Sequence, residues 1–556
     1  MSKTATQRVI EESVHPSRQF DAVVVGAGFS GLRMLHELRS LGLSAVVIEA
    51  GDDVGGTWWW NKYPGARTDT EAWYYCYSFS KEIIEEWNWS ERFPPQEEVL
   101  CYLTFVADRL ELRKDIEFKT RVESATYDET RNHWILTTDR GQDYQAKYFI
   151  SASGALSQPF LPDFPGVDSF EGRSLLPSRW PDEDIDFSGK RVAIVGTGAT
   201  GVQLTPILAQ TAEHVTVFQR TPNYVLPARN HTLSKQHMQG IRSEYDLIWE
   251  RAHKQAFGFG IEMIDRPLPS VTPEEAQRIL EAGWETGGFR FLFHTFSDIF
   301  VDEATNEIVA EFVRNKIRTI VHDPVTAELL CPKGYPVGGK RPPLGHYYFE
   351  AFNRDNVSLV DVNTDAIQEI TPTGIRTASQ EHEFDVIIYA TGFDAVTGAL
   401  TSMDVRGRDN LSLAEAWKDG PRTYLGFGVE GFPNFLMIYG PQSIFANVPV
   451  VVELSVKWIS KVLTYMEERG IDWMEPTTEA EVAYNQRLND VLNQTVIPKG
   501  AAAGSWFFGN NIPGKALAPL FEFSGVAAYT ELISQVAEDD FEGFTRSARA
   551  VAASVT

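Results

Sequence analysis

The sequence has few cysteines, and it has no long hydrophobic run. Cys76, Cys101 and Cys331 are far apart and form neither a CxxC pair nor a zinc-binding spacing, so we expect no metal site. No apolar stretch approaches the roughly 20 residues that span a bilayer. Residues 1–19 are polar and lack the apolar centre of a signal peptide, so they are expected to form a loose arm. We therefore expect a cytoplasmic protein with reduced thiols.

Positive charge is also scarce. The 556 residues include 50 Lys and Arg against 76 Asp and Glu, a formal net charge of −26. Such a surface repels phosphate backbones and anionic lipids, which argues against nucleic-acid and membrane partners. A bound phosphate would need a local cluster of basic residues. The 43% hydrophobic content is typical of a compact globular enzyme, expected to be a monomer or a weak oligomer with about two to four domains.

Glycine is plentiful, and at two places the glycines follow a regular GxGxxG spacing. The first is "FDAVVVGAGFSGLRMLHELRSLGLSAVVIEA", where an apolar strand at 22–25 runs into Gly26, Gly28 and Gly31. A helical pattern and a second strand at 45–48 follow, and the second strand ends at Glu49. This strand–helix–strand unit predicts a dinucleotide site, with the pyrophosphate at the helix N-terminus and the ribose hydroxyls on Glu49.

The unit recurs in "KRVAIVGTGATGVQLTPILAQTAEHVTVFQRT", with Gly196, Gly198 and Gly201. Here the second strand ends at Arg220 and Thr221, where the first unit has an acid. An arginine accommodates a 2′-phosphate that an acid would repel. The first site therefore suits FAD and the second suits NADPH.

The order of these units predicts an α/β fold with two Rossmann-like domains and a helical insertion in the second. The insertion is indicated by the helix start Thr272-Pro273-Glu274-Glu275 and by the amphipathic stretch 304–321. A buried strand at 386–391 is expected to return the chain to the FAD domain. The predicted divisions are FAD domain, 1–150; linker and NADPH domain, 151–231; helical insertion, 232–322; NADPH domain resumed, 323–384; FAD domain resumed and C-terminal region, 385–556.

Two longer motifs resemble the type I Baeyer–Villiger monooxygenases, and the similarity covers nearly the whole chain. The first is "GGTWWWNKYPGARTD" (55–69), which matches that family's flavin-domain pattern throughout. The second is "FEGRSLLPSRWPDE" (170–183), which resembles the family's linker fingerprint between the two glycine turns. Four of its positions match, namely Phe170, Gly172, Trp180 and Pro181, whereas Leu176 stands in place of the family's histidine.

The resemblance implies a role for many further residues. Arg341, in the similar stretch "GYPVGGKRPPLGHYYFEAFNRDNV", would be the active-site arginine, and Asp69 its partner. The residues expected to bind FAD or NADPH are Gly26, Gly28, Ser30, Gly31, Glu49, Gly56, Thr57, Trp58, Arg67, Thr68, Asp69, Tyr75, Val122, Gly196, Thr197, Gly198, Ala199, Thr200, Gly201, Gln203, Arg220, Thr221, Lys340 and Trp506. The expected substrate wall comprises Phe259, Gln442, Ser443, Ile444 and Phe445.

The activity implied is the insertion of one oxygen atom of O2 beside the carbonyl of an apolar ketone, through a C4a-peroxyflavin, to give an ester or lactone. A fixed guanidinium at Arg341 would stabilise the anionic oxygen. Three enzymatic alternatives remain at this point: oxidation of sulfur or nitrogen, an uncoupled NADPH oxidase that releases hydrogen peroxide, and a thiol-type flavin reductase, which the cysteine spacing disfavours. A regulatory NADPH-binding protein would not need Asp69 and Arg341. In the linker we expect Leu176 to affect the coupling of the domains and not the chemistry.

Overall fold

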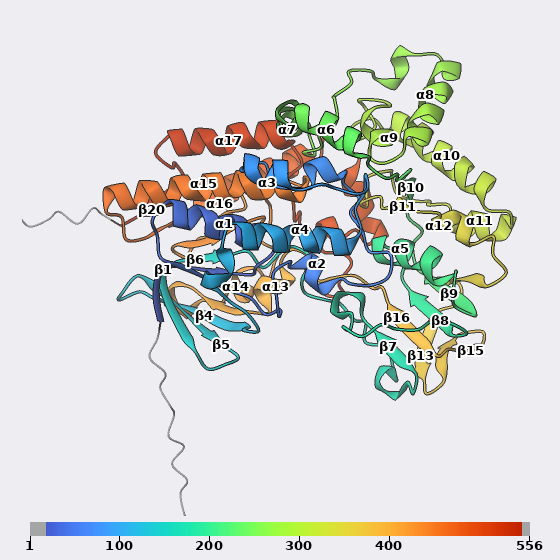
Figure 1. The fold of residues 1–556 in the computed structure, drawn as a ribbon, viewed down its shortest axis with the longest axis horizontal. Helices are drawn as coiled ribbons and strands as arrows, with labels where there is room; N and C mark the ends of the chain where they lie inside the picture. Colours follow the sequence, from blue (N-terminus) through green and yellow to red (C-terminus); the bar gives the residue numbers. More distant parts are fainter. Residues whose placement is uncertain (1–17, 548–556) are drawn as a thin grey trace, which may run out of the picture.

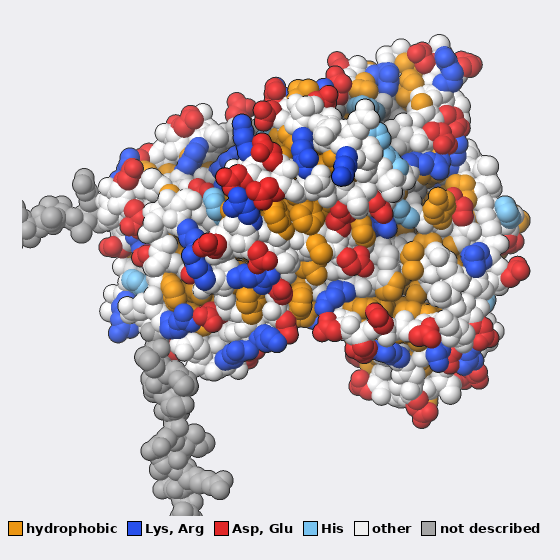
Figure 2. Space-filling model, viewed as in Figure 1, with side chains coloured by type: hydrophobic (Ala, Val, Ile, Leu, Met, Phe, Trp, Pro, Cys, Tyr) orange, Lys and Arg blue, Asp and Glu red, His pale blue; other side chains and the backbone are white. Residues whose placement is uncertain are grey.

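The computed structural model describes residues 18–547, so most of the predicted N-terminal arm lies outside the described residues. Two sheets lie side by side and are covered by helices, as Figure 1 shows. The fold is α/β with two Rossmann-type halves, as predicted. On the face shown in Figure 2, acidic and basic side chains are interspersed and form no single patch.

The first sheet has eight strands in the order β17-β4-β5-β6-β1-β2-β3, with β18 also paired to β6. Ala22, Val23 and Val24 of its central strand are fully buried, as expected of a parallel strand covered on both faces. The strands are β1 (Arg18–Val25), β2 (Ala45–Ile48), β3 (Ile116–Glu117), β4 (Val122–Asp128), β5 (His133–Thr138), β6 (Asp143–Ser151), β17 (Asp404–Arg406) and β18 (Phe435–Met437).

Helices from both ends of the chain cover this sheet, and α1 packs against the long helix α15 (Figure 1). Within this layer the rings of Phe427 and Trp458 stack with their centroids 4.2 Å apart. The helices of this half are α1 (Phe29–Ser40), α2 (Thr57–Trp60), α3 (Lys81–Glu86), α4 (Gln96–Arg109), α13 (Gly398–Thr401), α14 (Leu413–Ala416), α15 (Val448–Arg469), α16 (Thr478–Leu492) and α17 (Val526–Glu538).

The second sheet is parallel, in the order β12-β9-β8-β16-β7. Its glycine turn follows β8 and leads into α5, as the sequence predicts. The elements are β7 (Arg173–Leu175), β8 (Arg191–Val195), α5 (Ala199–Leu208), β9 (His214–Gln219), β12 (Val357–Asp361) and β16 (Val386–Tyr389).

One predicted boundary falls too early. The sequence predicts that the strand at 386–391 returns the chain to the FAD domain, but the observed strand, β16, pairs with β7 and β8 and so belongs to the second sheet. The chain rejoins the first sheet only at β17. A short apolar run indicates a buried strand but does not indicate which of two parallel sheets it joins.

The expected helical insertion lies along the upper part of Figure 1, with residues 273–320 at the upper right and residues 245–254 beside α17 of the first half. The Thr272 side chain accepts a hydrogen bond from the Glu275 backbone N–H, so α8 begins where the capping motif predicts. The helices within the predicted bounds of 232–322 are α6 (Lys235–Ser243), α7 (Tyr245–Lys254), α8 (Pro273–Thr286), α9 (Arg290–Phe293) and α10 (Glu303–Ile320). The next two helices, α11 (Pro324–Leu330) and α12 (Tyr348–Ala351), fall in the stretch predicted as the resumed NADPH domain.

Small sheets complete the fold. The parallel pair β10–β11 matters most for the site, because it joins the chain after β9 to the chain before α12. The remaining strands are β10 (Leu226–Pro227), β11 (Leu344–Gly345), β13 (Ile367–Thr371), β14 (Gly374–Thr377), β15 (Glu381–Glu383), β19 (Met474–Pro476) and β20 (Phe544–Arg546). Within residues 18–547, none of the helices combines the length and the apolar character that crossing a bilayer requires.

Candidate active site

A cavity of about 1250 Å³ is lined by residues of both sheets, the helical insertion and the C-terminal region. Pockets for a single small ligand are typically about 300–1,000 Å³, so this cavity can hold more than one ligand. An indentation between the two halves is visible at the lower edge of Figure 2.

The first glycine turn forms one end of the cavity. Gly26 has a φ of +106°, and a Cβ there would lie 2.5 Å from the Ala152 carbonyl oxygen. A Cβ on Gly31 would lie 1.8 Å from the Gly26 carbonyl oxygen, so the helix can approach the turn only without a side chain. Gly28 and Gly56 both line the cavity, and a Cβ on Gly28 would lie 3.4 Å from the Gly56 Cα. The turn therefore fits the close approach of a pyrophosphate, which the sequence predicts here.

Glu49 lies at the end of β2, against this turn. Its two carboxylate oxygens accept hydrogen bonds from the backbone N–H groups of Ala27 (2.7 Å) and Gly51 (2.6 Å). Burial raises the pKa of Glu49, and the two backbone donors oppose that rise. The side chain lines the cavity, so the carboxylate that holds the turn also borders the space that a ribose would occupy.

The other residues expected around FAD line the same end of the cavity. Trp58 Nε1 donates to the Tyr75 hydroxyl at 3.3 Å, and burial raises the pKa of Tyr75 to about 12, so this hydroxyl stays neutral. Ser30, Gly56, Thr57 and Val122 are also on the lining. Glycine turn, acid and apolar walls together fit a bound flavin dinucleotide.

The second glycine turn lies on the opposite wall. Gly196 has a φ of +115°, and a Cβ on Gly201 would lie 2.2 Å from the Gly196 carbonyl oxygen. A Cβ on Gly198 would meet nothing within 4 Å, because this glycine borders the open cavity. Thr197, Ala199 and Thr200 line the cavity beside it. This turn repeats the features of the first and fits a second dinucleotide.

Gln203 was expected to bind a cofactor, and the structure gives its amide protein partners. Its Nε2 donates to the Arg67 carbonyl oxygen at 3.1 Å, and its Oε1 accepts from the Tyr63 hydroxyl at 2.8 Å. The side chain borders the cavity, yet its hydrogen bonds join α5 to the segment that carries Arg67, Thr68 and Asp69. Sequence spacing could not indicate this contact between the two halves.

Two basic residues meet at the second turn. Arg220 and Lys340 both line the cavity, and among residues 18–547 neither forms an ion pair. Burial, and next the charge of Arg220, lower the pKa of Lys340 to about 8. The Lys340 ammonium donates to the Ala503 carbonyl oxygen at 3.2 Å. Arg220 and Lys340 thus form a small positively charged site in an otherwise acidic protein, as binding of a 2′-phosphate requires.

Arg341 and Asp69 form an ion pair between the two halves, with Nη1 and Oδ2 2.8 Å apart. The Asp69 side chain is 3% exposed and the Arg341 side chain 32% exposed, so the pair presents its guanidinium to the cavity. Burial raises the pKa of Asp69, and the Arg341 charge opposes that rise. The Arg341 guanidinium carbon lies 5.9 Å from the centre of the Phe289 ring.

Arg67 and Thr68, the two residues before Asp69, form hydrogen bonds that hold this segment in place. The Arg67 guanidinium donates to Glu91 at 2.9 Å and to the Phe93 carbonyl oxygen at 3.0 Å, while the Thr68 hydroxyl donates to the Thr70 carbonyl oxygen at 2.7 Å. Both residues line the cavity. Their hydrogen bonds fix the turn on which Asp69 lies.

The substrate wall is only partly the expected one. Phe259 and Phe445 line the cavity, and Trp506 lies beside Phe445 with ring centroids 6.1 Å apart. Gln442, Ser443 and Ile444 do not reach it: all three are fully buried behind the wall. The Gln442 side-chain oxygen instead accepts a hydrogen bond from the Thr423 backbone N–H at 2.9 Å. The Gln442 Nε2 donates to the Pro421 carbonyl oxygen at 2.9 Å, and a sequence pattern does not reveal such contacts.

Comparisons with known proteins place the chain in a family. A family model described as "Flavin-binding monooxygenase-like" matches residues 20–237. A Baeyer–Villiger monooxygenase from Pseudooceanicola batsensis is 44% identical over 95% of this chain and 96% of its own length. The chain belongs to the Baeyer–Villiger monooxygenases.

Two further relatives add detail about this family. A crystal structure of OTEMO in complex with FAD and NADP superposes with a TM-score of 0.92 at 41% identity, over 96% of this chain and all of that one. A phenazine N-monooxygenase from Lysobacter antibioticus is 42% identical over 94% of this chain and 96% of its own. This Baeyer–Villiger monooxygenase therefore has FAD and NADPH as its cofactors.

In this Baeyer–Villiger monooxygenase the linker contacts both halves. Leu176 packs, half-buried, against the apolar cluster of the second sheet. Three residues later, the Arg179 guanidinium lies 4.5 Å from the Trp60 ring on α2, and Lys62 is ion-paired with Asp182. A Cβ on Gly172 would lie 2.4 Å from the Phe170 ring, which explains the glycine at this position.

Several cavity residues were not predicted. Phe289 and Phe293 at either end of α9, together with Phe300, bring the helical insertion to the cavity. Phe293 and Phe257 are 5.3 Å apart between ring centroids. The only sequence signal was the density of phenylalanine in "GGFRFLFHTFSDIF", which is equally typical of an ordinary core.

Proposed function

We propose that this enzyme inserts one oxygen atom of O2 beside the carbonyl of an apolar ketone and forms an ester or lactone. The observation that supports the proposal most strongly is the Arg341–Asp69 ion pair, which presents a permanent positive charge to a cavity that Phe257, Phe259, Phe289 and Phe293 also line. When bound, FAD and NADPH supply the reducing equivalents and the activation of O2. The protein has to supply position, charge and exclusion of water.

Arg341 would stabilise the negative charge that develops on oxygen as the ketone reacts. A guanidinium does not lose its proton, so it acts as a fixed charge and not as an acid. In a cavity with little water such a charge is worth more than at the surface. Asp69 orients the guanidinium and offsets its charge, and the hydrogen bonds around Arg67 and Thr68 hold Asp69 in place.

The walls explain the preference for an apolar substrate. Phe257, Phe259 and Phe293 pack with centroid distances of 5.3–5.4 Å and offer no charged partner to a substrate. A charged group placed there would lose its hydration without gaining a hydrogen bond. Lys340, Arg220 and Thr221 lie at the second glycine turn and would hold the NADPH 2′-phosphate.

We also infer a cytoplasmic location and a monomer or weak oligomer. Cys76, Cys101 and Cys331 are all free, which suits a reducing compartment. One chain supplies both glycine turns, the ion pair and the aromatic wall, so a single copy has the parts of the site.

The substitution Arg341→Ala tests the assignment of the catalytic residue. We expect NADPH still to reduce the flavin, because Arg220 and Lys340 remain, while ester formation falls by at least about 100-fold, the usual cost of losing one such stabilising donor. Stopped-flow absorbance measures flavin reduction, and gas chromatography measures the ester. Undiminished ester formation in Arg341→Ala would refute this role for Arg341.

A further inference from the structure

Two loops carry the basic residues of the second dinucleotide site. The loop that follows β9 carries Arg220, and the loop that ends at β11 carries Lys340 and Arg341. Beyond these residues the two loops join, where Leu226 of β10 pairs with Leu344 of β11. The spacing of the three cations therefore depends on what holds the loops together between the glycine turn and this pairing.

Two buried tyrosines cross-link the loops. The Tyr335 hydroxyl donates to the Pro222 carbonyl oxygen at 2.7 Å, and the Tyr224 hydroxyl donates to the Tyr335 carbonyl oxygen at 3.0 Å. Their rings meet edge to face with centroids 5.3 Å apart, and both side chains are buried. Each loop thus holds the backbone of the other.

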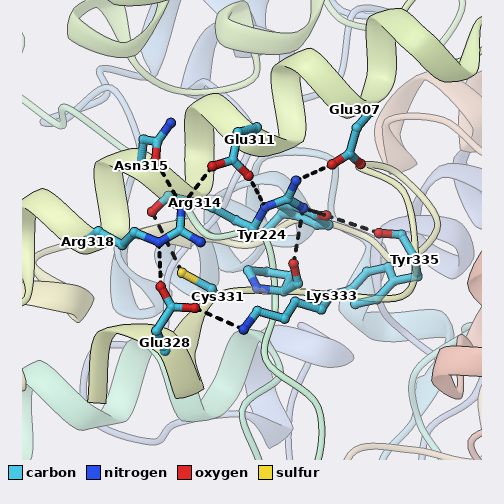
Figure 3. A network of polar contacts seen from close by, with 11 residues as sticks. Tyr224, Glu307, Glu311, Arg314, Asn315, Arg318, Glu328, Cys331, Lys333 and Tyr335 are labelled. Atoms are coloured by element: carbon cyan, nitrogen blue, oxygen red, sulfur yellow. Dashed lines mark hydrogen bonds and ion pairs between the residues drawn. The ribbon is translucent and has the colours of Figure 1, made fainter. Parts of the chain in front are cut away.

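Arg314 of α10 is the outer support of this cross-link, as Figure 3 shows. It is 8% exposed, and its Nη1 donates to the Tyr224 hydroxyl and to the Pro332 carbonyl oxygen, both at 3.4 Å. Its other nitrogens are ion-paired with Glu307 and Glu311 on the same helix. The planar Arg314 guanidinium therefore contacts both loops and anchors them to α10. The single ammonium of a lysine lacks the spread of donors that this requires.

Asn306 provides a second anchor on the same helix. Its Nδ2 donates to the Val337 carbonyl oxygen at 2.9 Å, and its Oδ1 accepts from the Val337 backbone N–H at 3.0 Å. The loop that carries Lys340 and Arg341 is thus attached to α10 at two places. Neither Asn306 nor Arg314 lines the cavity.

We propose that Arg314 is a positioning residue for recognition of the NADPH 2′-phosphate. This inference rests on the cofactor assignment above and adds a source of its selectivity. By holding Tyr224 and Pro332, Arg314 keeps Arg220 and Lys340 at the spacing that one phosphate can bridge. Loss of Arg314 lets the loops separate, which weakens the contact that only the 2′-phosphate makes and leaves the rest of the dinucleotide site intact.

The test compares NADP⁺ and NAD⁺ binding by isothermal titration calorimetry on the FAD-loaded enzyme. In Arg314→Met we expect the Kd for NADP⁺ to rise roughly tenfold, in line with the loss of hydrogen bonds to buried groups. The Kd for NAD⁺, which has no 2′-phosphate, should change less than about twofold. A general loss of stability would weaken the binding of both nucleotides, so the ratio of the two Kd values is the readout.

Arg318→Met is the matched control. Arg318 lies one turn further along α10 and shares Glu311 with Arg314, but its other partners are Asn315 and Glu328 at the surface (Figure 3). We expect an unchanged ratio in this variant. An equal loss of NADP⁺ preference in both variants would overturn the assignment, because it would reflect the helix and not the contact with the loops.

A second variant keeps the test decisive if Arg314→Met does not fold. Tyr335→Phe removes only the hydroxyl, which donates to the Pro222 carbonyl oxygen at 2.7 Å and to Asn223 Oδ1 at 3.4 Å, and we expect a roughly threefold loss of NADP⁺ preference. An unchanged ratio in Tyr335→Phe, or in a folded Arg314→Met, overturns the inference while the cofactor assignment stands. A wild-type enzyme that binds NAD⁺ as tightly as NADP⁺ overturns both.

Discussion

At the scale of single residues, two neighbours in the sequence have different electrostatic environments. Arg341 carries a guanidinium, which is a permanent charge, and it is paired with the buried carboxylate of Asp69, 2.8 Å away. Lys340 has no acidic partner among the described residues, and burial, followed by the nearby charge of Arg220, lowers its pKa to about 8. One cation is therefore fixed, as stabilisation of charge requires, whereas the other titrates near neutral pH.

The titration of Lys340 predicts a pH dependence of NADP⁺ binding. Below pH 8 the free enzyme has a charged Lys340, and above pH 8 the ammonium loses its proton unless the 2′-phosphate restores it. Binding then requires uptake of a proton, and the Kd for NADP⁺ should rise by up to about tenfold for each pH unit above 8. Calorimetry between pH 6.5 and 9.5 checks this.

NAD⁺ provides the comparison, since its Kd should not follow the titration of Lys340. Lys340→Arg should also flatten the NADP⁺ profile, because a guanidinium remains charged over this range. A wild-type profile that is flat up to pH 9.5 would show that Lys340 does not face the phosphate.

The role of a residue could be predicted from the sequence where that role depends only on the local backbone conformation. Gly26 and Gly196 occupy turns with positive φ, and the spacing of the glycines predicted both turns. The protein contacts of Gln442 and Gln203 were not predictable: the first is buried behind the cavity wall, and the second bonds to a segment 136 residues away in sequence. Such contacts depend on the tertiary structure, which one sequence does not display.

At the scale of elements, the linker of residues 170–183 connects the two halves. Leu176 packs on the second sheet, and Arg179 reaches Trp60 on α2 and lines the cavity. A polar ring in place of Leu176 would disturb that apolar contact and shift Arg179 with it. Because no reacting group lies at position 176, the effect should appear in coupling.

We therefore predict that Leu176→His changes the fraction of NADPH that ends as hydrogen peroxide and leaves the ranking of ketone substrates unchanged. Peroxide and ester are measured together over a set of ketones. Val360→His is the control, because Val360 packs on the same cluster from β12, away from the linker. A changed substrate ranking in Leu176→His would mean that the linker shapes the substrate site.

Elements were predicted well where the sequence pattern is local. The capping motif at Thr272 located α8, and the glycine turns located α1 and α5. The sheet to which β16 belongs was predicted wrongly, because pairing between distant strands leaves no local mark. The contribution of α9 to the cavity was missed because it also depends on contacts between segments that are distant in sequence.

At the scale of the whole molecule, the site exists only where the halves meet. Asp69 comes from the first half and Arg341 from the second, and Gln203 joins the same two regions. The helical insertion closes the cavity with phenylalanines. This arrangement puts the reduction site, the fixed charge and the apolar wall around one space, which is what transfer of oxygen to a ketone without leakage requires.

The stoichiometry of the wild-type enzyme tests this account most directly. NADPH consumed, hydrogen peroxide released and product formed are measured together over a panel of apolar ketones, with a sulfide and a nitrogen heterocycle included. The account predicts one ester or lactone per NADPH with at least one ketone, and little peroxide. Peroxide in proportion to NADPH with every ketone, or oxidation of only the sulfide or the heterocycle, would contradict it.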